Sequence, residues 1–267
     1  MPVHPLAEPF VADGDAESPR GRVGILLSHG FTGSPASMRP WAEYLASHGY
    51  AVSLPRLPGH GTTWQEMNKT TWADWYGEVE RAFEALANQV DTVVVCGLSM
   101  GGALAMRLAA DHPDRVSGLV LVNPAVTTER KDVKLLPLLK HVIPAMPGIA
   151  NDIKKPGVQE HGYTKTPLRA ADSMFQAYKV LHADLGRVVC PILLFRSTED
   201  HVVDPSSGRA IRSTVASTDV REELLQDSYH VATLDNDAQQ IFEGSLAFVE
   251  RVAGLASEAS GGGRTEP

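Results

Sequence analysis

The hydrophobic positions of this chain follow two patterns that alternate along most of its length. Short runs of consecutive apolar residues predict buried strands, whereas apolar residues spaced three and four apart predict amphipathic helices. Strands that are buried on both faces and alternate with helices are typical of parallel βαβ units, so we predict an α/β fold with a mostly parallel central sheet. Functional residues in such a sheet gather at the carboxyl ends of the strands. The predicted strands fall within residues 23–30, 51–61, 93–99, 117–125, 191–200 and 221–230, and the predicted helices within 38–50, 72–90, 100–111, 169–181, 206–215 and 238–252.

Residues 127–186 interrupt this alternation. The segment carries no obvious strand, and its apolar run at 135–149 is broken by three prolines. About 60 residues without a strand is far longer than an ordinary connection. We therefore predict a cap inserted over the carboxyl edge of the sheet, with core helices that only thicken the domain as the alternative. The chain then divides into an N-terminal arm or irregular first strand (1–20), a core (21–126 and 187–256), a cap insertion (127–186) and a flexible tail (257–267).

The composition predicts a globular protein that does not bind nucleic acid. The chain has 267 residues and a formal net charge of −8, and it lacks the clusters of Lys and Arg that bind phosphates. Cys96 and Cys190 lie in or beside apolar runs, which predicts buried free thiols. The first 20 residues lack the features of a secretory signal, and the run at 135–149 is too short and too interrupted to span a membrane. We therefore expect a cytoplasmic protein.

A serine between two glycines lies where a predicted strand turns into a predicted helix. The stretch VVVCGLSMGG puts Ser99 between Gly97 and Gly101, which is the form of a nucleophile elbow. At such an elbow the serine has a strained backbone, and the glycines let neighbouring chain pass close because they have no Cβ atom. The N-terminus of the following helix favours negative charge at the same point. The alternative is a tight turn that happens to contain serine.

A serine hydroxyl becomes a good nucleophile only when a base takes its proton. His230, in QDSYHVATLD, follows the last predicted strand and is the candidate base, with a capping role in its loop as the alternative. The base needs a carboxylate that fixes its tautomer, and Asp200 ends the strand PILLFRSTED between Ser99 and His230 in the chain. Two other acids compete for that role. Glu199 would point the other way if the strand continues, and Asp204 could instead cap the helix that follows.

Acyl transfer also needs hydrogen-bond donors for the oxyanion of its tetrahedral intermediate. The backbone N–H of Met100, the residue after the serine, is one candidate donor. The backbone N–H of Phe31, in the loop SHGFTGSP, is the second, with a plain glycine turn as the alternative for that loop. His29 and His60 also lie in glycine turns, and we expect them to orient loops.

Four motifs in order, LSHGFTGSP, GLSMGG, TEDHVV and SYHVATLD, together resemble the bacterial carboxylesterase and monoacylglycerol lipase family of α/β-hydrolases. The resemblance extends over about residues 21–252. It implies an α/β-hydrolase fold with a small cap, and a cytosolic serine hydrolase. It also implies a nucleophile at Ser99, an orienting acid at Asp200, a base at His230, and oxyanion positions at Phe31 and Met100.

The resemblance bears on the substrate as well. In monoacylglycerol lipases the cap supplies an apolar channel for one acyl chain and a polar end for glycerol. Here residues 135–149 are suited to line such a channel, and Glu160 falls where a glycerol hydroxyl would be bound; a solvated surface glutamate is the alternative.

We therefore expect an esterase that hydrolyses monoacylglycerols, with a small lipid ester as its partner. We expect no metal and no organic cofactor, because the chain lacks their binding motifs. A general carboxylesterase without preference for glycerol is the first alternative, and a non-catalytic ligand receptor with the same fold is the second.

Overall fold

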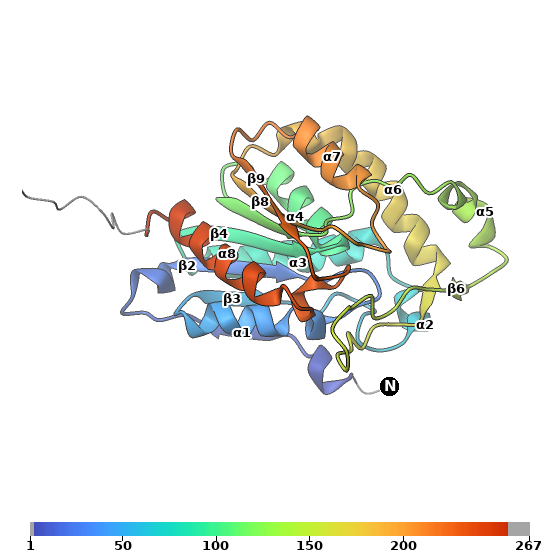
Figure 1. The fold of residues 1–267 in the computed structure, drawn as a ribbon, viewed down its shortest axis with the longest axis horizontal. Coiled ribbons are helices and arrows are strands. Elements are labelled where there is room, and N and C mark those ends of the chain that lie inside the picture. The colour runs from blue at the N-terminus through green and yellow to red at the C-terminus, as the bar shows by residue number, and fades with distance from the viewer. Residues whose placement is uncertain (1–2, 256–267) are drawn as a thin grey trace, which may run out of the picture.

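The computed structural model describes residues 3–255, which form a seven-stranded central sheet flanked by helices (Figure 1). The strand order is β1-β3-β2-β4-β5-β8-β9, and all neighbours pair in parallel except β1, which runs antiparallel to β3. The predicted fold class, a mostly parallel sheet between helices, is therefore confirmed. The strands span Phe10–Asp13 (β1), Val23–Ser28 (β2), Ala51–Leu54 (β3), Thr92–Leu98 (β4), Gly118–Val122 (β5), Ile192–Ser197 (β8) and Val220–Leu225 (β9).

The helices cover both faces of the sheet and close a hydrophobic core on each. Trp41 of α1 and Phe242 of α8 belong to one core, whereas Trp75 and Phe83 of α3 belong to the other, together with α4 and α7. In Figure 1, α1 and α8 lie in front of the sheet and α4 lies behind it. The helices outside residues 127–186 span Arg39–Ser47 (α1), Trp64–Met67 (α2), Trp72–Ala87 (α3), Met100–Asp111 (α4), Ser206–Thr214 (α7) and Ala238–Val252 (α8).

The position of each strand in the sheet explains how clearly the sequence predicts it. Every residue of β2 and β5, which lie inside the sheet, is buried; β5 is a continuous apolar run, and β2 is one as far as its last residue, Ser28. In contrast, β9 lies at the edge of the sheet and, among the described strands, pairs with β8 alone; all but one of its residues keep contact with solvent. Its polar sequence VREELL therefore gives only a weak strand signal.

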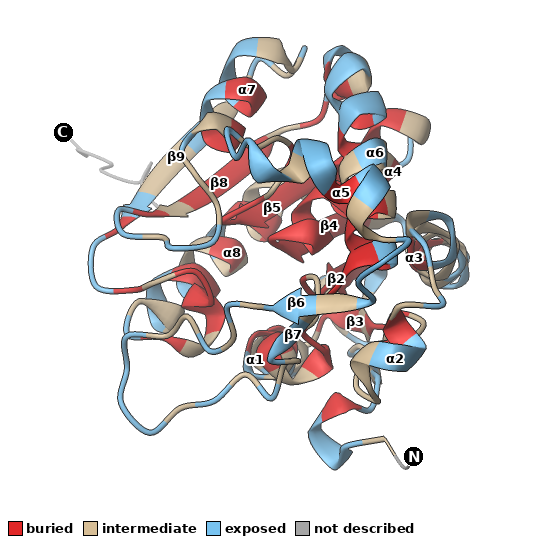
Figure 2. Ribbon diagram, turned by 90° about the vertical axis from the view of Figure 1, so that its right-hand side faces the viewer, coloured by how far each residue is buried: buried red, intermediate tan, exposed pale blue. Residues whose placement is uncertain are grey.

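The segment 127–186 contains two short strands that the sequence analysis did not predict. β6 and β7 form a separate antiparallel pair of three residues per strand, and each strand includes a proline. A strand of that length carries too few residues for a period-two pattern to be detected. Figure 2 shows β6, β7 and α5 in front of the buried ends of the central strands. The elements of the segment are α5 (Leu136–Leu139), β6 (Ala145–Pro147), β7 (Lys165–Pro167) and α6 (Leu168–Asp184).

Part of the predicted N-terminal arm forms regular structure. Within the predicted arm, residues 10–13 form the regular strand β1, which pairs with β3. The predicted tail, 257–267, lies outside the described residues. We propose that residues 127–186 form a cap on the core. Cys96 and Cys190 are buried and free, as predicted. A search of the described residues found no helix that is long and apolar enough to cross a membrane.

Candidate active site

Ser99 lies in the sharp turn between β4 and α4, at the carboxyl end of the sheet. Its φ of 55° and ψ of −118° fall in a region that residues with a side chain rarely adopt. The Ser99 N–H donates a hydrogen bond to the carbonyl of Val122 at the end of β5 (3.0 Å). The Ser99 carbonyl accepts hydrogen bonds from Gly102 (3.0 Å) and Ala125 (3.1 Å). The strained turn that the sequence predicts is therefore present, and it is fixed from two sides.

The glycines around Ser99 have no room for a side chain. A Cβ atom on Gly101 would lie 2.0 Å from the carbonyl oxygen of Ser28 in β2. One on Gly97 would lie 2.4 Å from the carbonyl of Gly101, so only glycine fits at either position. A Cβ on Gly30 would lie 3.3 Å from the Cβ of Ser99, which shows how closely the loop after β2 passes the serine.

His230 and Asp200 meet from the loops that follow β9 and β8. The Nδ1 of His230 lies 2.9 Å from Oδ2 of Asp200, and both side chains are buried. Asp200 is itself fixed, because its Oδ1 accepts hydrogen bonds from the N–H groups of Val202 and Val203, each at 2.8 Å.

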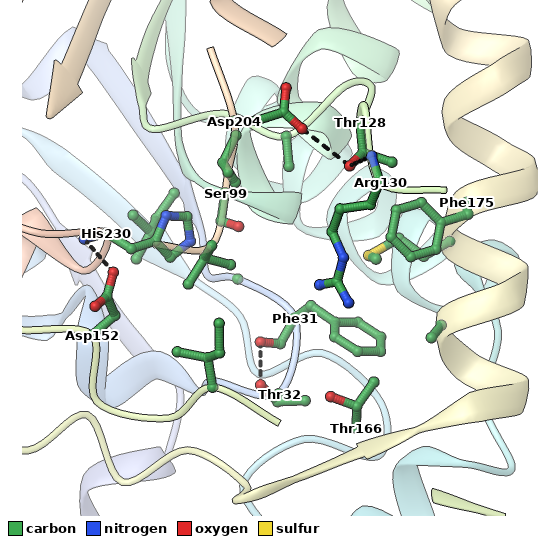
Figure 3. Close-up of a pocket in the computed structure, with 18 of the residues that line it drawn as sticks. Phe31, Thr32, Ser99, Thr128, Arg130, Asp152, Thr166, Phe175, Asp204 and His230 are labelled. Atoms are coloured by element: carbon green, nitrogen blue, oxygen red, sulfur yellow. Dashed lines mark hydrogen bonds between the residues drawn. The ribbon is translucent and has the colours of Figure 1, made fainter. Parts of the chain in front are cut away.

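Ser99 and His230 project into the same pocket (Figure 3). Because Asp200 occupies Nδ1, the Nε2 of His230 is the nitrogen that remains for the serine. In the described part of the chain no hydrogen bond joins the Ser99 hydroxyl to His230; such bonds commonly tighten only when substrate binds.

The charges around His230 and Asp200 favour an ion pair. Burial lowers the pKa of His230, but nearby carboxylates, Asp200 foremost, outweigh burial and raise the pKa above its ordinary value of 6.5. Burial raises the pKa of Asp200, yet the charge of His230 and the hydrogen bonds to Asp200 keep it below its ordinary value of 3.8. An ionised carboxylate at Nδ1 stabilises the imidazolium that forms when His230 accepts a proton.

The two acids that compete with Asp200 in the sequence make different contacts. Glu199 is exposed. Asp204 accepts a hydrogen bond from the N–H of Ser206 at the start of α7 (2.9 Å) and another from the N–H of Glu129 (2.9 Å). Asp204 therefore holds the first residue of the following helix, although the N-cap position itself is occupied by Pro205. Of the three acids, only Asp200 contacts His230.

The loop after β2 brings Phe31 next to the elbow. The Phe31 N–H has no hydrogen-bond acceptor among residues 3–255, and Met100 is the first residue of α4, where helical N–H groups lack an intrahelical partner. His29 holds this loop as expected, because its buried Nε2 accepts a hydrogen bond from the N–H of Leu57 (3.1 Å). Burial, and then the neighbouring His60, lowers the pKa of His29 well below 6.5, so the imidazole is neutral.

A cavity of about 170 Å³ opens beside Ser99 (Figure 3). Phe31 and one face of α6 line part of it with apolar side chains, and the charged Arg130 lies beside Phe31 and Phe175 (Figure 3). Asp152 and Glu160 line the cavity as carboxylates. The α6 residues that line the cavity are Ala171, Met174, Phe175 and Tyr178.

Glu160 reaches this cavity from residues 127–186, the proposed cap, which we call the cap segment. A Cβ atom on Gly33 would lie 2.6 Å from its Oε1, so the carboxylate packs against the loop after β2 and is not a freely solvated surface group. Burial, with a smaller contribution from Asp152, raises the pKa of Glu160 to about 7, against an opposing effect of His230. In the described chain no group donates a hydrogen bond to this carboxylate, so it is available to a hydroxyl of a ligand.

Two residues of the cavity, and one that bonds to the loop after β3, were not predicted from the sequence. Asp152 bonds to the backbone of His230 (3.1 Å), and Arg130 lines the cavity. The Tyr163 hydroxyl accepts a hydrogen bond from the N–H of Thr62 and donates one to the carbonyl of Gly59, both at 2.8 Å. All three lie within residues 127–186. Asp152 and Tyr163 bond to residues that are far from them in the chain, whereas Arg130 pairs with Asp132 nearby and lines the cavity through the fold of the segment. No local motif therefore marks them.

The comparisons with known proteins agree with this geometry. Residues 18–237 match the family described as serine aminopeptidase, S33. The chain belongs to the serine aminopeptidase S33 family. This S33 family member is 43% identical over 258 residues to a thermostable monoacylglycerol lipase of Bacillus sp. (strain H-257), covering 95% of this chain and 98% of the relative. It is 24% identical over 233 residues to a carboxylesterase of Bacillus subtilis (strain 168), covering 87% and 94%.

A solved structure is similar to this S33 family member over the whole fold. It is that of a metagenome-derived lipolytic enzyme, with a TM-score of 0.88, 43% identity, and coverage of 94% of this chain and 100% of the other. The resemblance to bacterial monoacylglycerol lipases and carboxylesterases is therefore confirmed, and so is the α/β-hydrolase fold. The protein is an enzyme of the serine hydrolase class.

Proposed function

We propose that the protein hydrolyses monoacylglycerols to glycerol and a free fatty acid through an acyl-enzyme on Ser99. The observation that carries the proposal is the shape of the cavity. Ser99 and His230 line the cavity together with an apolar face of α6 and the carboxylate of Glu160, which accepts no hydrogen bond from any of the described residues. Such a cavity suits a molecule with one acyl chain, a carbonyl in the middle and hydroxyl groups at the other end. The Bacillus relative, named a monoacylglycerol lipase, supports the same substrate.

In the first half-reaction, Nε2 of His230 takes the proton of the Ser99 hydroxyl, and the serine oxygen attacks the ester carbonyl carbon. The carbonyl π electrons move to oxygen, and the N–H groups of Phe31 and Met100 bind that oxyanion. Asp200 stabilises the imidazolium. The intermediate collapses with cleavage of the bond to the glycerol oxygen, which takes the proton from His230. The acyl group stays on Ser99.

In the second half-reaction, water replaces glycerol and follows the same steps. His230 removes a proton from water, the resulting hydroxide attacks the acyl-enzyme, and the fatty acid leaves as Ser99 regains its proton. Asp200 and the other nearby carboxylates raise the pKa of His230 above 6.5 against the effect of burial, which makes the imidazole a stronger base for the serine proton.

The two ends of the substrate have different partners in this proposal. The acyl chain lies against Met174 and Phe175 of α6, and a glycerol hydroxyl donates a hydrogen bond to Glu160. We also propose that the protein acts in the cytoplasm, since its two cysteines are free, which is typical of a reducing compartment.

The test is kcat/KM on monoacylglycerols of increasing chain length, compared with di- and triacylglycerols and with ethyl esters of the same acids. A clear preference for monoacylglycerols, weakened in Glu160→Ala, supports the proposal. Equal or faster turnover of ethyl esters contradicts it. The general carboxylesterase would then stand in its place, which the similarity to the Bacillus subtilis carboxylesterase favours.

A second measurement tests the mechanism apart from the substrate. Ser99→Ala should hydrolyse p-nitrophenyl butyrate no faster than the buffer does, and a fluorophosphonate should label the unaltered protein but not this variant. Substantial p-nitrophenyl activity in Ser99→Ala contradicts the proposed nucleophile. Failure of the unaltered protein to react with the fluorophosphonate would favour a ligand receptor.

A further inference from the structure

A carboxylate of the cap segment contacts the loops of both His230 and Asp200. Asp152 is 9% exposed, and its Oδ2 accepts a hydrogen bond from the backbone N–H of His230 (3.1 Å; Figure 3). Its Oδ1 lies 2.7 Å from Nδ1 of His201, and its Oδ2 accepts a second hydrogen bond from the N–H of His201 (3.2 Å). His201 directly follows Asp200. Asp152 therefore links His201, the neighbour of Asp200, to His230.

The contacts of Asp152 bridge three segments that are distant in the chain. His201 is 49 residues away and His230 is 78 residues away. The main chain of Asp152 adds a fourth bond, because its carbonyl accepts from the N–H of Val231 (3.0 Å). Both oxygens of one buried carboxylate are thus used, which is a strong and directional arrangement. If the only role of this segment were to cover the cavity, it would need no such contact with His230.

A second buried carboxylate, Asp235, anchors the same cap segment without touching His230 or His201. It accepts hydrogen bonds from the N–H groups of Lys154 and Lys155 (2.7 and 2.8 Å). The segment therefore has an anchor that does not depend on Asp152. The contacts of Asp152 with His230 and His201 are additional to that anchoring.

We propose that Asp152 is a positioning residue: from the cap, its carboxylate holds the loops of Asp200 and His230 in the relative placement that proton transfer from Ser99 requires. The inference rests on the proposed serine mechanism. It goes beyond that mechanism, because it makes the cap part of the catalytic machinery and not only a wall of the substrate cavity. The physical reason is that proton transfer between Ser99 and His230 needs hydrogen-bond distance, and a displacement of about 1 Å costs up to about 10²-fold in rate.

The charge of Asp152 gives the inference a readout that simple loss of packing does not have. The carboxylates that face His230 are Asp200 from the loop after β8, and Glu160 and Asp152 from the cap, and His201 pairs with Asp152 at the far side of that carboxylate. All three carboxylates carry negative charge when ionised, and each raises the pKa of His230. Removing the charge of Asp152 must therefore lower that pKa. Activity falls at acid pH because His230 becomes protonated. A lower pKa of His230 therefore moves this fall to a lower pH.

The experiment compares Asp152→Asn with the unaltered full-length protein on p-nitrophenyl butyrate, an activated ester that does not depend on a glycerol preference. We expect kcat to fall roughly 10- to 100-fold with little change in KM. We expect the acid limb of the kcat/KM profile to move down by roughly 0.5 to 1 pH unit.

The matched control is Asp227→Asn. Asp227 lies in the same loop as His230 and pairs with Lys154 of the same cap segment (3.0 Å), but it is exposed and does not contact His230. It should change neither quantity.

A second variant keeps the test valid if Asp152→Asn folds poorly. His201 is half exposed, so its side chain can be removed without disturbing the core. It faces Asp152, Glu199 and Asp200, and Asp152 first of all raises its pKa above 6.5, so at acid pH it carries a positive charge beside Asp152. In His201→Ala that charge is gone, and the acid limb should move to higher pH, opposite to the shift in Asp152→Asn.

Three results would overturn the inference. One is a kcat and an acid limb in Asp152→Asn equal to those of the unaltered protein. The second is the same change in Asp227→Asn, which would mean that any loss of charge or anchoring there has this effect. The third is an acid limb that does not move in His201→Ala. Loss of the monoacylglycerol preference alone leaves the inference intact, whereas p-nitrophenyl activity in Ser99→Ala would refute the mechanism on which it rests.

Discussion

At the scale of single residues, the site depends on one strained backbone and two buried carboxylates with different partners. Ser99 has a positive φ that the packing of β2, β4 and α4 imposes. Asp200 uses one oxygen for backbone N–H groups and the other for His230, so the imidazole is held at Nδ1. Asp152 holds the backbone of the same histidine. Ring and backbone of His230 are thus fixed by separate residues.

The role of Asp200 can be tested against that of its neighbour Asp204. In Asp200→Asn, we expect kcat to fall by about 10³- to 10⁴-fold with KM little changed, because the amide no longer holds the required tautomer or stabilises the imidazolium. Asp204→Asn should keep most of its activity and melt at a lower temperature, because Asp204 holds the start of α7 and of the cap segment. Steady-state kinetics and thermal melts of both variants check this. Equal losses of kcat would contradict the assignment of the acid.

At the scale of elements, the sequence predicts the core well where a pattern is local. The helix predicted at 238–252 has those bounds in the structure, and the helix predicted at 72–90 ends three residues earlier. The misses are short or irregular elements. α2 has four residues, and β6 and β7 have three each. These elements depend on tertiary contacts, since an isolated turn of helix or a three-residue strand has almost no stability of its own.

Two glycines on neighbouring helices should respond to alanine in opposite ways. In α4, Gly101→Ala forces a Cβ atom against the carbonyl of Ser28, and we expect it to cost about 1–3 kcal/mol of unfolding free energy and most of the activity. In α3, no atom of residues 3–255 lies within 4 Å of the corresponding position at Gly77, so Gly77→Ala should stabilise the protein by about 0.5–1 kcal/mol at full activity. Chemical denaturation measures both. A stable and active Gly101→Ala would show that the elbow tolerates a side chain.

At the scale of the whole molecule, the sheet brings residues that are distant in the chain together at one edge, and the cap segment adds polar groups above them. This arrangement buries charge at a cost to stability. Glu160 has a pKa of about 7 in the folded protein, against an ordinary value of 4.5. Between those pH values the folded state binds more protons than the unfolded state, so the free energy of unfolding falls as the pH rises through that range.

Glu160→Gln should therefore stabilise the protein only where the carboxylate would be ionised. We expect this variant to melt at a higher temperature than the unaltered protein at pH 8, and the difference to vanish near pH 5, because the folded protein then carries a neutral Glu160 in any case. Thermal melts at the two pH values check this. Glu199→Gln is the control, since Glu199 is exposed, and it should change little at either pH. A stabilisation that is equal at both pH values would contradict the explanation by charge burial.

The sequence by itself determined the features that depend on neighbours in the chain. A strand followed by GLSMGG fixes a sharp turn with Ser99 at its tip, because glycine alone fits where β4, α4 and β2 approach. The order of Ser99, Asp200 and His230 along the alternating strands and helices then predicts that they meet at one edge of a parallel sheet. Only the tertiary structure decided the rest. In it Asp200, and not Asp204, contacts His230, Glu160 reaches the cavity, and Asp152 bonds to His230. These contacts link segments tens of residues apart that no local pattern connects.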